Sequence, residues 1–162
     1  MTTHTLSARV GEALRLRGWR LATAESCTGG AVAAAITDIA GSSQWFDRGF
    51  VTYSNQAKRE MLGVRAQTLD SVGAVSEDTV REMVAGALAR SSAQVALAIS
   101  GIAGPGGGTP DKPVGTVCFA WATAGGVTRV RTEHLSGDRA AVRAASVVVA
   151  LQGVLDVLPG QA

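Results

Sequence analysis

The most informative segment of the chain is Thr23-Ala24-Glu25-Ser26-Cys27-Thr28-Gly29-Gly30. It lies between a short apolar run and an alanine-rich segment with helical spacing, so it predicts a turn from a strand into a helix. A hydroxyl at such a turn lies near the positive end of the helix dipole, among free backbone N–H groups. Acyl transfer needs a nucleophile with hydrogen-bond donors close by that stabilise the oxyanion. Ser26 is therefore a candidate nucleophile, with the amides of Thr28 and Gly29 as candidate oxyanion donors.

Ser26 also has simpler interpretations. A serine at this position can cap the helix that follows, without any chemistry. Cys27 is a rival nucleophile, because thiols at helix N-termini have lowered pKa values. Neighbouring side chains of a turn point in different directions, so only one of these two residues can face a substrate. We favour Ser26, because the chain offers it a plausible base.

The candidate base is Lys58. Ser54 or Asn55 can cap a helix that places Lys58 in its first turn, where the helix dipole disfavours the ammonium form. A lysine in such a position can act as a neutral base near physiological pH, although most lysines are simply solvated surface charges. The chain has two histidines, of which His4 lies in the N-terminal tail and His134 closes a predicted strand. A serine–histidine arrangement is therefore possible only through His134.

Tyr53 is the only tyrosine of the chain and precedes Lys58 by five positions. Its hydroxyl could relay a proton or orient Lys58. The alternative is an ordinary amphipathic residue at the end of a strand.

A glycine-rich loop from Gly101 to Pro113 is the third specialised segment. Positions 101–108 include five glycines, and the loop holds three of the four prolines. Glycine lets backbone amides approach a ligand, and proline limits flexibility. The loop follows a predicted strand, as phosphate-binding loops do, but it matches neither the P-loop nor the dinucleotide fingerprint, and a rigid surface turn is the alternative. We expect a mononucleotide or sugar phosphate to bind this loop, and the substrate-binding candidates are Asn55, Ser100, Gly101, Gly104, Gly106, Gly107 and Arg139. Arg139 could pair with a phosphate or carboxylate, or it could be an ordinary residue in the first turn of a helix.

Apolar periodicity predicts alternating helices and strands along the chain. Helices are expected over about 6–17, 31–39, 55–62, 77–88 and 139–158, and strands over 20–24, 46–53, 95–99, 114–124 and 127–134. The last two strands would form a hairpin around Gly125-Gly126. This order predicts a three-layer α/β/α sandwich with a mixed, mostly parallel sheet and one late hairpin. We expect a single domain over residues 1–162.

Composition excludes several classes of function. Hydrophobic residues make up 46% and charged residues 17%, which indicates a globular chain. The net charge of +2 comes with scattered basic residues, so no nucleic-acid-binding patch is expected. No apolar run has the length that a bilayer requires. Two separated cysteines suggest neither a disulfide framework nor a zinc site. We therefore expect a cytoplasmic protein that needs no metal or cofactor and binds neither membranes nor nucleic acid.

Five motifs in order resemble the CinA C-terminal family, over about Leu6 to Leu158. They are TAESCTGG, YSNQAK followed by LGV, GAVSEDT, SGIAGPGGGTPDKPVGTV and SGDR. The family includes stand-alone nicotinamide-nucleotide amidohydrolases. The resemblance implies an α/β/α domain, usually oligomeric, that deamidates nicotinamide mononucleotide to nicotinate mononucleotide and ammonia without a metal.

The resemblance also implies site residues. The family's serine nucleophile falls on Ser26, its lysine base on Lys58 and its supporting tyrosine on Tyr53. Ser100 opens the glycine-rich loop where the family often has threonine, which keeps the hydroxyl, and the arginine of SGDR is Arg139. Two other functions stay open: a non-enzymatic partner of a DNA-uptake or repair machine, and an amidase or esterase with another substrate.

Overall fold

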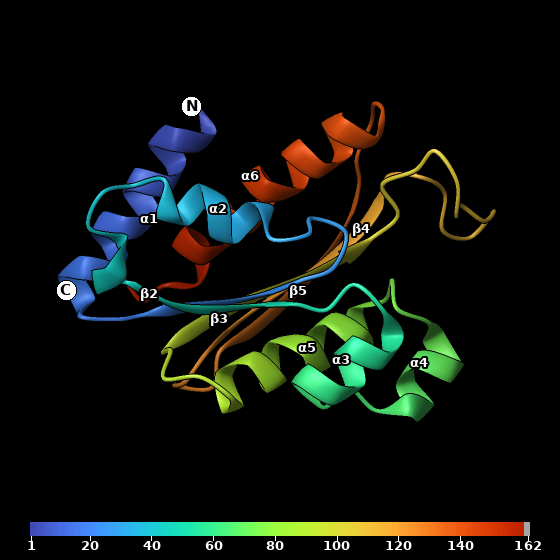
Figure 1. Cartoon of the computed structure of the whole chain (residues 1–162), viewed down its shortest axis with the longest axis horizontal. Coiled ribbons are helices and arrows are strands. Elements are labelled where there is room, and N and C mark those ends of the chain that lie inside the picture. The colour runs from blue at the N-terminus through green and yellow to red at the C-terminus, as the bar shows by residue number, and fades with distance from the viewer. Residues whose placement is uncertain (161–162) are drawn as a thin grey trace.

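A mixed β-sheet forms the middle layer of the computed structural model, which describes residues 1–160 (Figure 1). Its five strands lie in the order β2-β1-β3-β4-β5. β1 is parallel to β2 and β3, and β4 is antiparallel to β3 and β5, so β4 alone runs against the others. This confirms the mixed, mostly parallel sheet and the late hairpin. The strands are β1 (Leu21–Glu25), β2 (Phe46–Val51), β3 (Val95–Gly101), β4 (Thr116–Thr123) and β5 (Thr128–His134).

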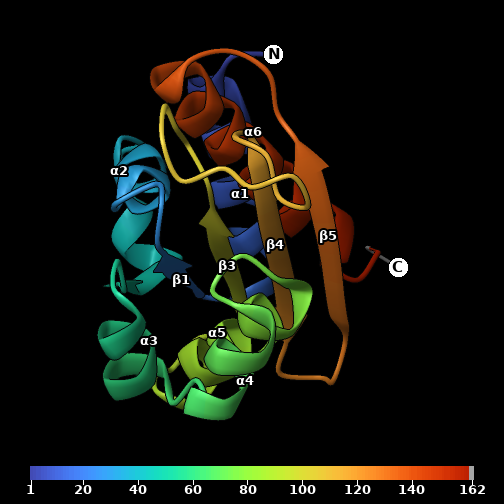
Figure 2. The ribbon, with the colours of Figure 1, turned by 90° about the vertical axis from the view of Figure 1, so that its right-hand side faces the viewer.

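Helices cover both faces of this sheet, which confirms the three-layer α/β/α architecture (Figures 1 and 2). One face carries α1 (Thr3–Arg17), α2 (Ala31–Thr37) and α6 (Arg139–Val157). The other carries α3 (Asn55–Leu62), α4 (Ala66–Val72) and α5 (Glu77–Ala89). A short 3₁₀ turn, Ser42–Gln44, precedes β2. The expected domain extended to residue 162, and its last two residues lie outside the described part.

Capping residues set the ends of several helices as the sequence predicted. Ser54, Ser76 and Asp138 each accept a hydrogen bond from the backbone N–H three residues ahead. Ser54 rather than Asn55 therefore caps α3. Gly18 and Gly63 end α1 and α3 with φ values of 65° and 70°, a conformation that favours glycine.

The two faces of the sheet differ in the size of their side chains, because successive residues of a strand alternate between faces. Large residues face α1, α2 and α6: Leu21, Val95, Leu97, Ile99, Val117, Phe119 and Trp121. Small residues face α5: Ala22, Ala24, Ala96, Ala98, Cys118, Ala120 and Ala122. We call this second set the alanine face.

On the side of the alanine face, the helices also pack closely against one another. At Gly86 of α5, an added Cβ would lie 1.9 Å from the Leu62 carbonyl oxygen at the end of α3. Glycine is therefore required at this contact, and α3 is held at a fixed position beside α5. This matters for the site, because α3 carries Lys58.

One helix has the length and composition that a membrane span requires. Among the described residues, α6 is the single helix that passes this test, although the sequence suggested no such run. Its buried side chains, among them Val142, Ala150, Leu151 and Val154, belong to the core on the large-residue face of the sheet. In this fold α6 is thus a core helix.

The carboxyl ends of β1, β2 and β3 meet at one edge of the sheet (Figure 1). β1 leads to β2 on one side, whereas β3 lies on its other side, so the strand order reverses between β1 and β3. Open α/β sheets form their ligand crevice at such a switch point. Ser26 and Lys58 follow β1 and β2, and Ser100 lies at the end of β3, so the topology brings the three motifs together.

Candidate active site

Ser26 and Lys58 are in direct contact at the switch point. Ser26 follows β1, and its backbone N–H donates to the Ile99 carbonyl of β3 at 3.0 Å. Lys58 lies in the first turn of α3, and its Nζ donates to Ser26 Oγ at 3.1 Å. Both side chains are buried, with Lys58 1% and Ser26 7% exposed. The structure thus brings together the two residues that the sequence suggested as nucleophile and base.

Burial sets the protonation of Lys58. Removal from water disfavours the ammonium form and lowers the pKa of Lys58. The sequence predicted a lowered pKa from the helix N-terminus and partial burial, and burial is the main cause. Lys58 Nζ also donates to the carbonyl of Thr52 at 2.9 Å and to that of Tyr53 at 3.4 Å, and these bonds fix its direction.

Cys27 lies beside this pair but has the wrong protonation state for a nucleophile. It is 6% exposed, and burial raises the pKa of its thiol to about 11. The expectation of a lowered thiol pKa at this turn is therefore wrong, because desolvation outweighs the nearby positive charges. At neutral pH the residue is a neutral thiol.

Glu25 binds backbone amides at the N-terminal end of α2, which the sequence suggested would be free. Its buried carboxylate accepts from Val32 N–H at 2.9 Å and from Ala33 N–H at 3.1 Å, in the first turn of α2. These amides are consequently not available to a substrate, and the carboxylate offsets the helix dipole. The sequence contained no signal for this role, because Glu25 ends β1 and lies five residues before Gly30, the N-cap of α2.

The two predicted oxyanion donors lie outside the pocket that Ser26 faces. Gly29 N–H donates to the Ser26 carbonyl at 3.0 Å, so this amide closes the turn. Thr28 is fully buried, and within residues 1–160 its N–H has no protein acceptor. Thr28 can thus still serve as a donor, whereas Gly29 cannot without opening the turn.

A pocket of about 280 Å³ lies beside Ser26 and Lys58. It gathers all the other predicted site residues. It also includes Ala74 and Val75, which the sequence analysis quoted as part of GAVSEDT but gave no role. Its lining consists of Ser26, Cys27, Tyr53, Asn55, Lys58, Ala74, Val75, Ser100, Gly101, Ile102, Ala103, Gly104, Gly106, Gly107 and Arg139.

Arg139 joins two walls of this pocket. Its guanidinium donates to Gly104 O of the glycine-rich loop at 2.9 Å and to Tyr53 Oη at 3.1 Å. The Tyr53 hydroxyl is thus directed towards Arg139, and it is the Tyr53 carbonyl that contacts Lys58. Remaining N–H groups of Arg139 could bind an anionic part of a ligand.

No histidine of the described part of the chain lines the pocket beside Ser26 and Lys58. His134 does not line the pocket, and its Nδ1 lies 3.4 Å from Thr116 Oγ1 at the far edge of the β4–β5 hairpin. Within residues 1–160, no group of three or more metal-ligating side chains is found. Lys58 is therefore the base that the geometry offers to Ser26.

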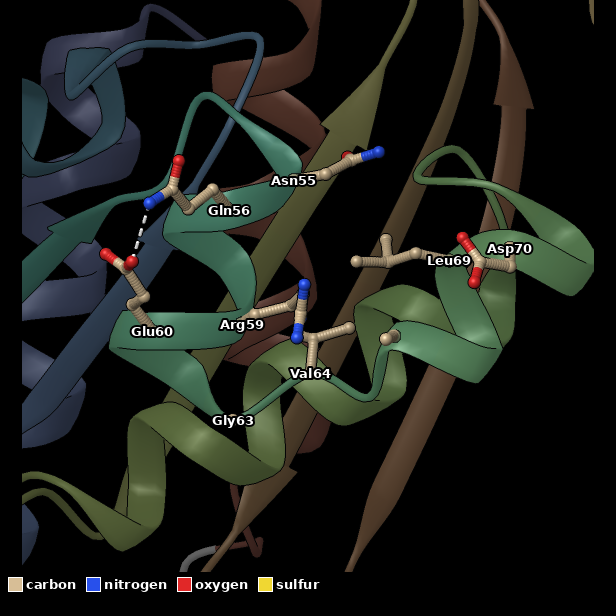
Figure 3. A pocket seen from close by; sticks show the side chains of 9 residues that line it. Asn55, Gln56, Arg59, Glu60, Gly63, Val64, Leu69 and Asp70 are labelled. Carbon is tan, nitrogen blue, oxygen red and sulfur yellow. Dashed lines mark hydrogen bonds between the residues drawn. The ribbon is translucent and has the colours of Figure 1, made fainter.

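A larger cavity of about 710 Å³ lies between α3 and α4 (Figure 3). It shares only Asn55 with the pocket beside Ser26. Its side chains are polar at the rim, where Gln56 Nε2 donates to Glu60 at 2.7 Å. It contains no nucleophile paired with a base, so we place the chemistry in the smaller pocket.

A serine hydroxyl paired with a buried lysine in a switch-point crevice is an arrangement that suits amide- or ester-cleaving enzymes with a hydroxyl nucleophile. Sequence comparison then gives the family. The chain belongs to the CinA C-terminal domain family, whose model matches residues 3–158.

Similar proteins cover nearly the whole chain. The nicotinamide-nucleotide amidohydrolase PncC of Escherichia coli (strain K12) is 61% identical over 147 residues, which cover 91% of this chain and 89% of the relative. The protein of the same name from Enterobacter agglomerans is 56% identical over 152 residues, covering 94% and 93%. The crystal structure of the competence damage-inducible protein A from Klebsiella pneumoniae matches with a TM-score of 0.93 at 47% identity, covering 97% of each chain. Amidohydrolases are hydrolases that act on amide bonds, and two of these relatives carry that name.

Proposed function

We propose that the chain is a nicotinamide-nucleotide amidohydrolase, which converts nicotinamide mononucleotide to nicotinate mononucleotide and ammonia. The observation that carries the proposal is the buried Lys58 Nζ at 3.1 Å from Ser26 Oγ. Relatives that are named nicotinamide-nucleotide amidohydrolase support this choice of substrate. The pocket volume of about 280 Å³ lies near the lower end of ligand pockets, roughly 300–1,000 Å³, which suits a small substrate.

In the proposed reaction, neutral Lys58 takes the proton of Ser26 as the serine oxygen attacks the carboxamide carbon. The amide oxygen becomes an oxyanion, which a backbone N–H of the turn after Ser26 stabilises. Lys58 then gives its proton to the amide nitrogen, the C–N bond breaks and ammonia leaves. Water hydrolyses the acyl-enzyme with Lys58 again as base, which releases the carboxylate and restores Ser26.

We assign the phosphate of the substrate to the glycine-rich loop and Arg139. Arg139 already donates to Tyr53 Oη and Gly104 O, so its side chain is held over the pocket. Tyr53 then acts by orienting Arg139. From the family, we further propose a homo-oligomer in the cytoplasm that uses no cofactor, membrane or nucleic acid.

The test is ammonia release from the purified protein with nicotinamide mononucleotide and, separately, with free nicotinamide. We expect turnover of the nucleotide alone, because binding energy from the remote phosphate helps to orient the amide. Equal turnover of both compounds would contradict the assigned phosphate site. Absence of turnover with both would contradict the substrate.

A further inference from the structure

Arg143 holds the turn that carries Ser26, although neither the motifs nor the pocket includes it. It lies one helical turn after Arg139 on α6 and is half-buried. Its Nε donates to the Cys27 carbonyl at 3.1 Å, and its Nη2 donates to the Thr28 carbonyl at 3.2 Å. One guanidinium therefore holds two successive carbonyls of the nucleophile turn.

These two bonds fix the direction of two backbone amides. In a trans peptide the N–H points opposite to the C=O of the same peptide plane. Because the Cys27 carbonyl is held towards Arg143, the Thr28 N–H points away from Arg143. The Thr28 carbonyl likewise directs the Gly29 N–H away, and that amide reaches the Ser26 carbonyl at 3.0 Å.

Most other amides near Ser26 already have acceptors. Ile99 O accepts from Ser26 N–H, and Thr28 O accepts from Ala31 N–H. Glu25 accepts from the next two amides of α2. Within residues 1–160, Cys27, Thr28 and Gly30 are left with N–H groups that have no acceptor in the protein, and Arg143 sets the direction of the one on Thr28.

We propose that Arg143 is a positioning residue, which orients the Cys27–Thr28 peptide so that the Thr28 N–H can stabilise the oxyanion formed at Ser26. This rests on Ser26 as the nucleophile of the proposed function. A planar guanidinium suits the role because its N–H groups hold both carbonyls in one rigid fork, which a lysine ammonium cannot reproduce. The oxyanion donor then comes from the turn and not from the helix end.

The experiment measures how fast a fluorophosphonate probe modifies Ser26 in the full-length protein, with the site confirmed by peptide mass spectrometry. Its phosphoryl oxygen needs the same donor as the oxyanion. We expect Arg143→Ala to slow labelling by at least about tenfold, since loss of one oxyanion donor costs roughly a hundredfold or more in known enzymes. Arg143→Lys should remain slow, and millimolar guanidine should partly restore Arg143→Ala. Gln152→Ala, a solvent-exposed change on the same helix, should label like the wild type.

Kinetics with nicotinamide mononucleotide separate positioning from a structural role. In both Arg143 variants kcat should fall while KM stays within about twofold, because an oxyanion donor acts mainly in the transition state. The midpoint of the pH–rate profile should not move, because the contacts of Lys58 are unchanged. A midpoint that rises, with full kcat regained at high pH, would mean that Arg143 acts only by its charge on Lys58, and would overturn the proposal.

The remaining outcomes are also decisive. Wild-type labelling rates in Arg143→Ala would overturn the positioning role, and if that variant does not fold, Arg143→Lys carries the same test. Failure of the wild type to label at Ser26 would remove the nucleophile and this inference with it. Labelling at Ser26 without turnover of nicotinamide mononucleotide would refute the substrate alone, and the labelling comparison would still decide the role of Arg143.

Discussion

Burial acts in opposite directions on Lys58 and Cys27, which line the same pocket. It lowers the pKa of the amine and raises the pKa of the thiol to about 11, because a low-dielectric environment disfavours both charged forms. The same physical cause therefore leaves more of the lysine in the neutral form that accepts a proton, and more of the cysteine as the unreactive thiol. This supports Ser26, which the sequence already favoured over Cys27, as the proposed nucleophile.

We expect Ser26→Ala to reduce turnover by at least about a thousandfold, since members of a catalytic unit fail together. Cys27→Ala should keep most of the activity, because its thiol stays protonated at neutral pH. Steady-state rates of ammonia release measure both variants. Loss of activity in Cys27→Ala with a folded protein would make the enzyme a thiol amidase.

The lowered pKa of Lys58 predicts a pH dependence of the rate. The neutral amine is the active form, so kcat should rise with pH along one ionisation limb whose midpoint lies below the ordinary lysine pKa. Lys58→Arg should be inactive at every pH tested, because a guanidinium does not give up its proton. Substantial activity in Lys58→Arg would show that Lys58 supplies only positive charge.

At the scale of elements, local signals were enough to predict most helices and strands. Ser54, Ser76 and Asp138 cap helices through their own side chains, and such signals can be read from a few neighbouring residues. α4 was missed because it is short and Arg65 provides no side-chain cap at its start. Arg143 was missed because its contact with Cys27 joins positions 116 residues apart, which no local pattern reveals.

The contact between α5 and α3 gives a prediction at this scale. Gly86→Ala should lower the free energy of unfolding by about 1–3 kcal/mol or more, because its Cβ would overlap the Leu62 carbonyl. Alanine favours helices, so propensity alone predicts the opposite sign. The exposed neighbour provides the control: Ala85→Gly should cost about 1 kcal/mol through propensity. Urea denaturation measures both, and a more stable Gly86→Ala variant would contradict the close contact.

For the whole molecule, the strand order explains why distant motifs form one site. Ser26 and Lys58 follow β1 and β2, and Ser100 lies at the end of β3; the carboxyl ends of these three strands meet at the switch point. The sequence predicted the class of fold and contained the motifs, but it could not give the distances and directions between the residues of the site. It therefore named the amides of both Thr28 and Gly29 as oxyanion donors, whereas in the structure the Gly29 N–H closes the turn on the Ser26 carbonyl.

Chelation tests the chemistry of the complete protein. In the proposed mechanism Lys58, whose Nζ contacts Ser26 Oγ, is the base, so no step requires a metal-bound hydroxide. Turnover should therefore be unchanged after extensive dialysis against EDTA, measured against a mock-dialysed sample. Activity that disappears and returns specifically with zinc or manganese would contradict the serine–lysine mechanism.

The buried amine of Lys58 also couples folding to proton uptake. Its pKa is lowered in the folded state and returns to the ordinary value on unfolding, so between these two values the unfolded chain binds more protons. In that interval the contribution of Lys58 to stability rises with pH, and below it the contribution is constant and unfavourable. Measuring Tm across pH for the wild type and for Lys58→Met isolates the contribution of Lys58 to stability. The Tm of the variant minus the Tm of the wild type should decrease as pH rises. The rise in pH that converts Lys58 to the neutral base of the proposed mechanism therefore also removes the cost of burying its charge, so one ionisation links activity to the contribution of this residue to stability.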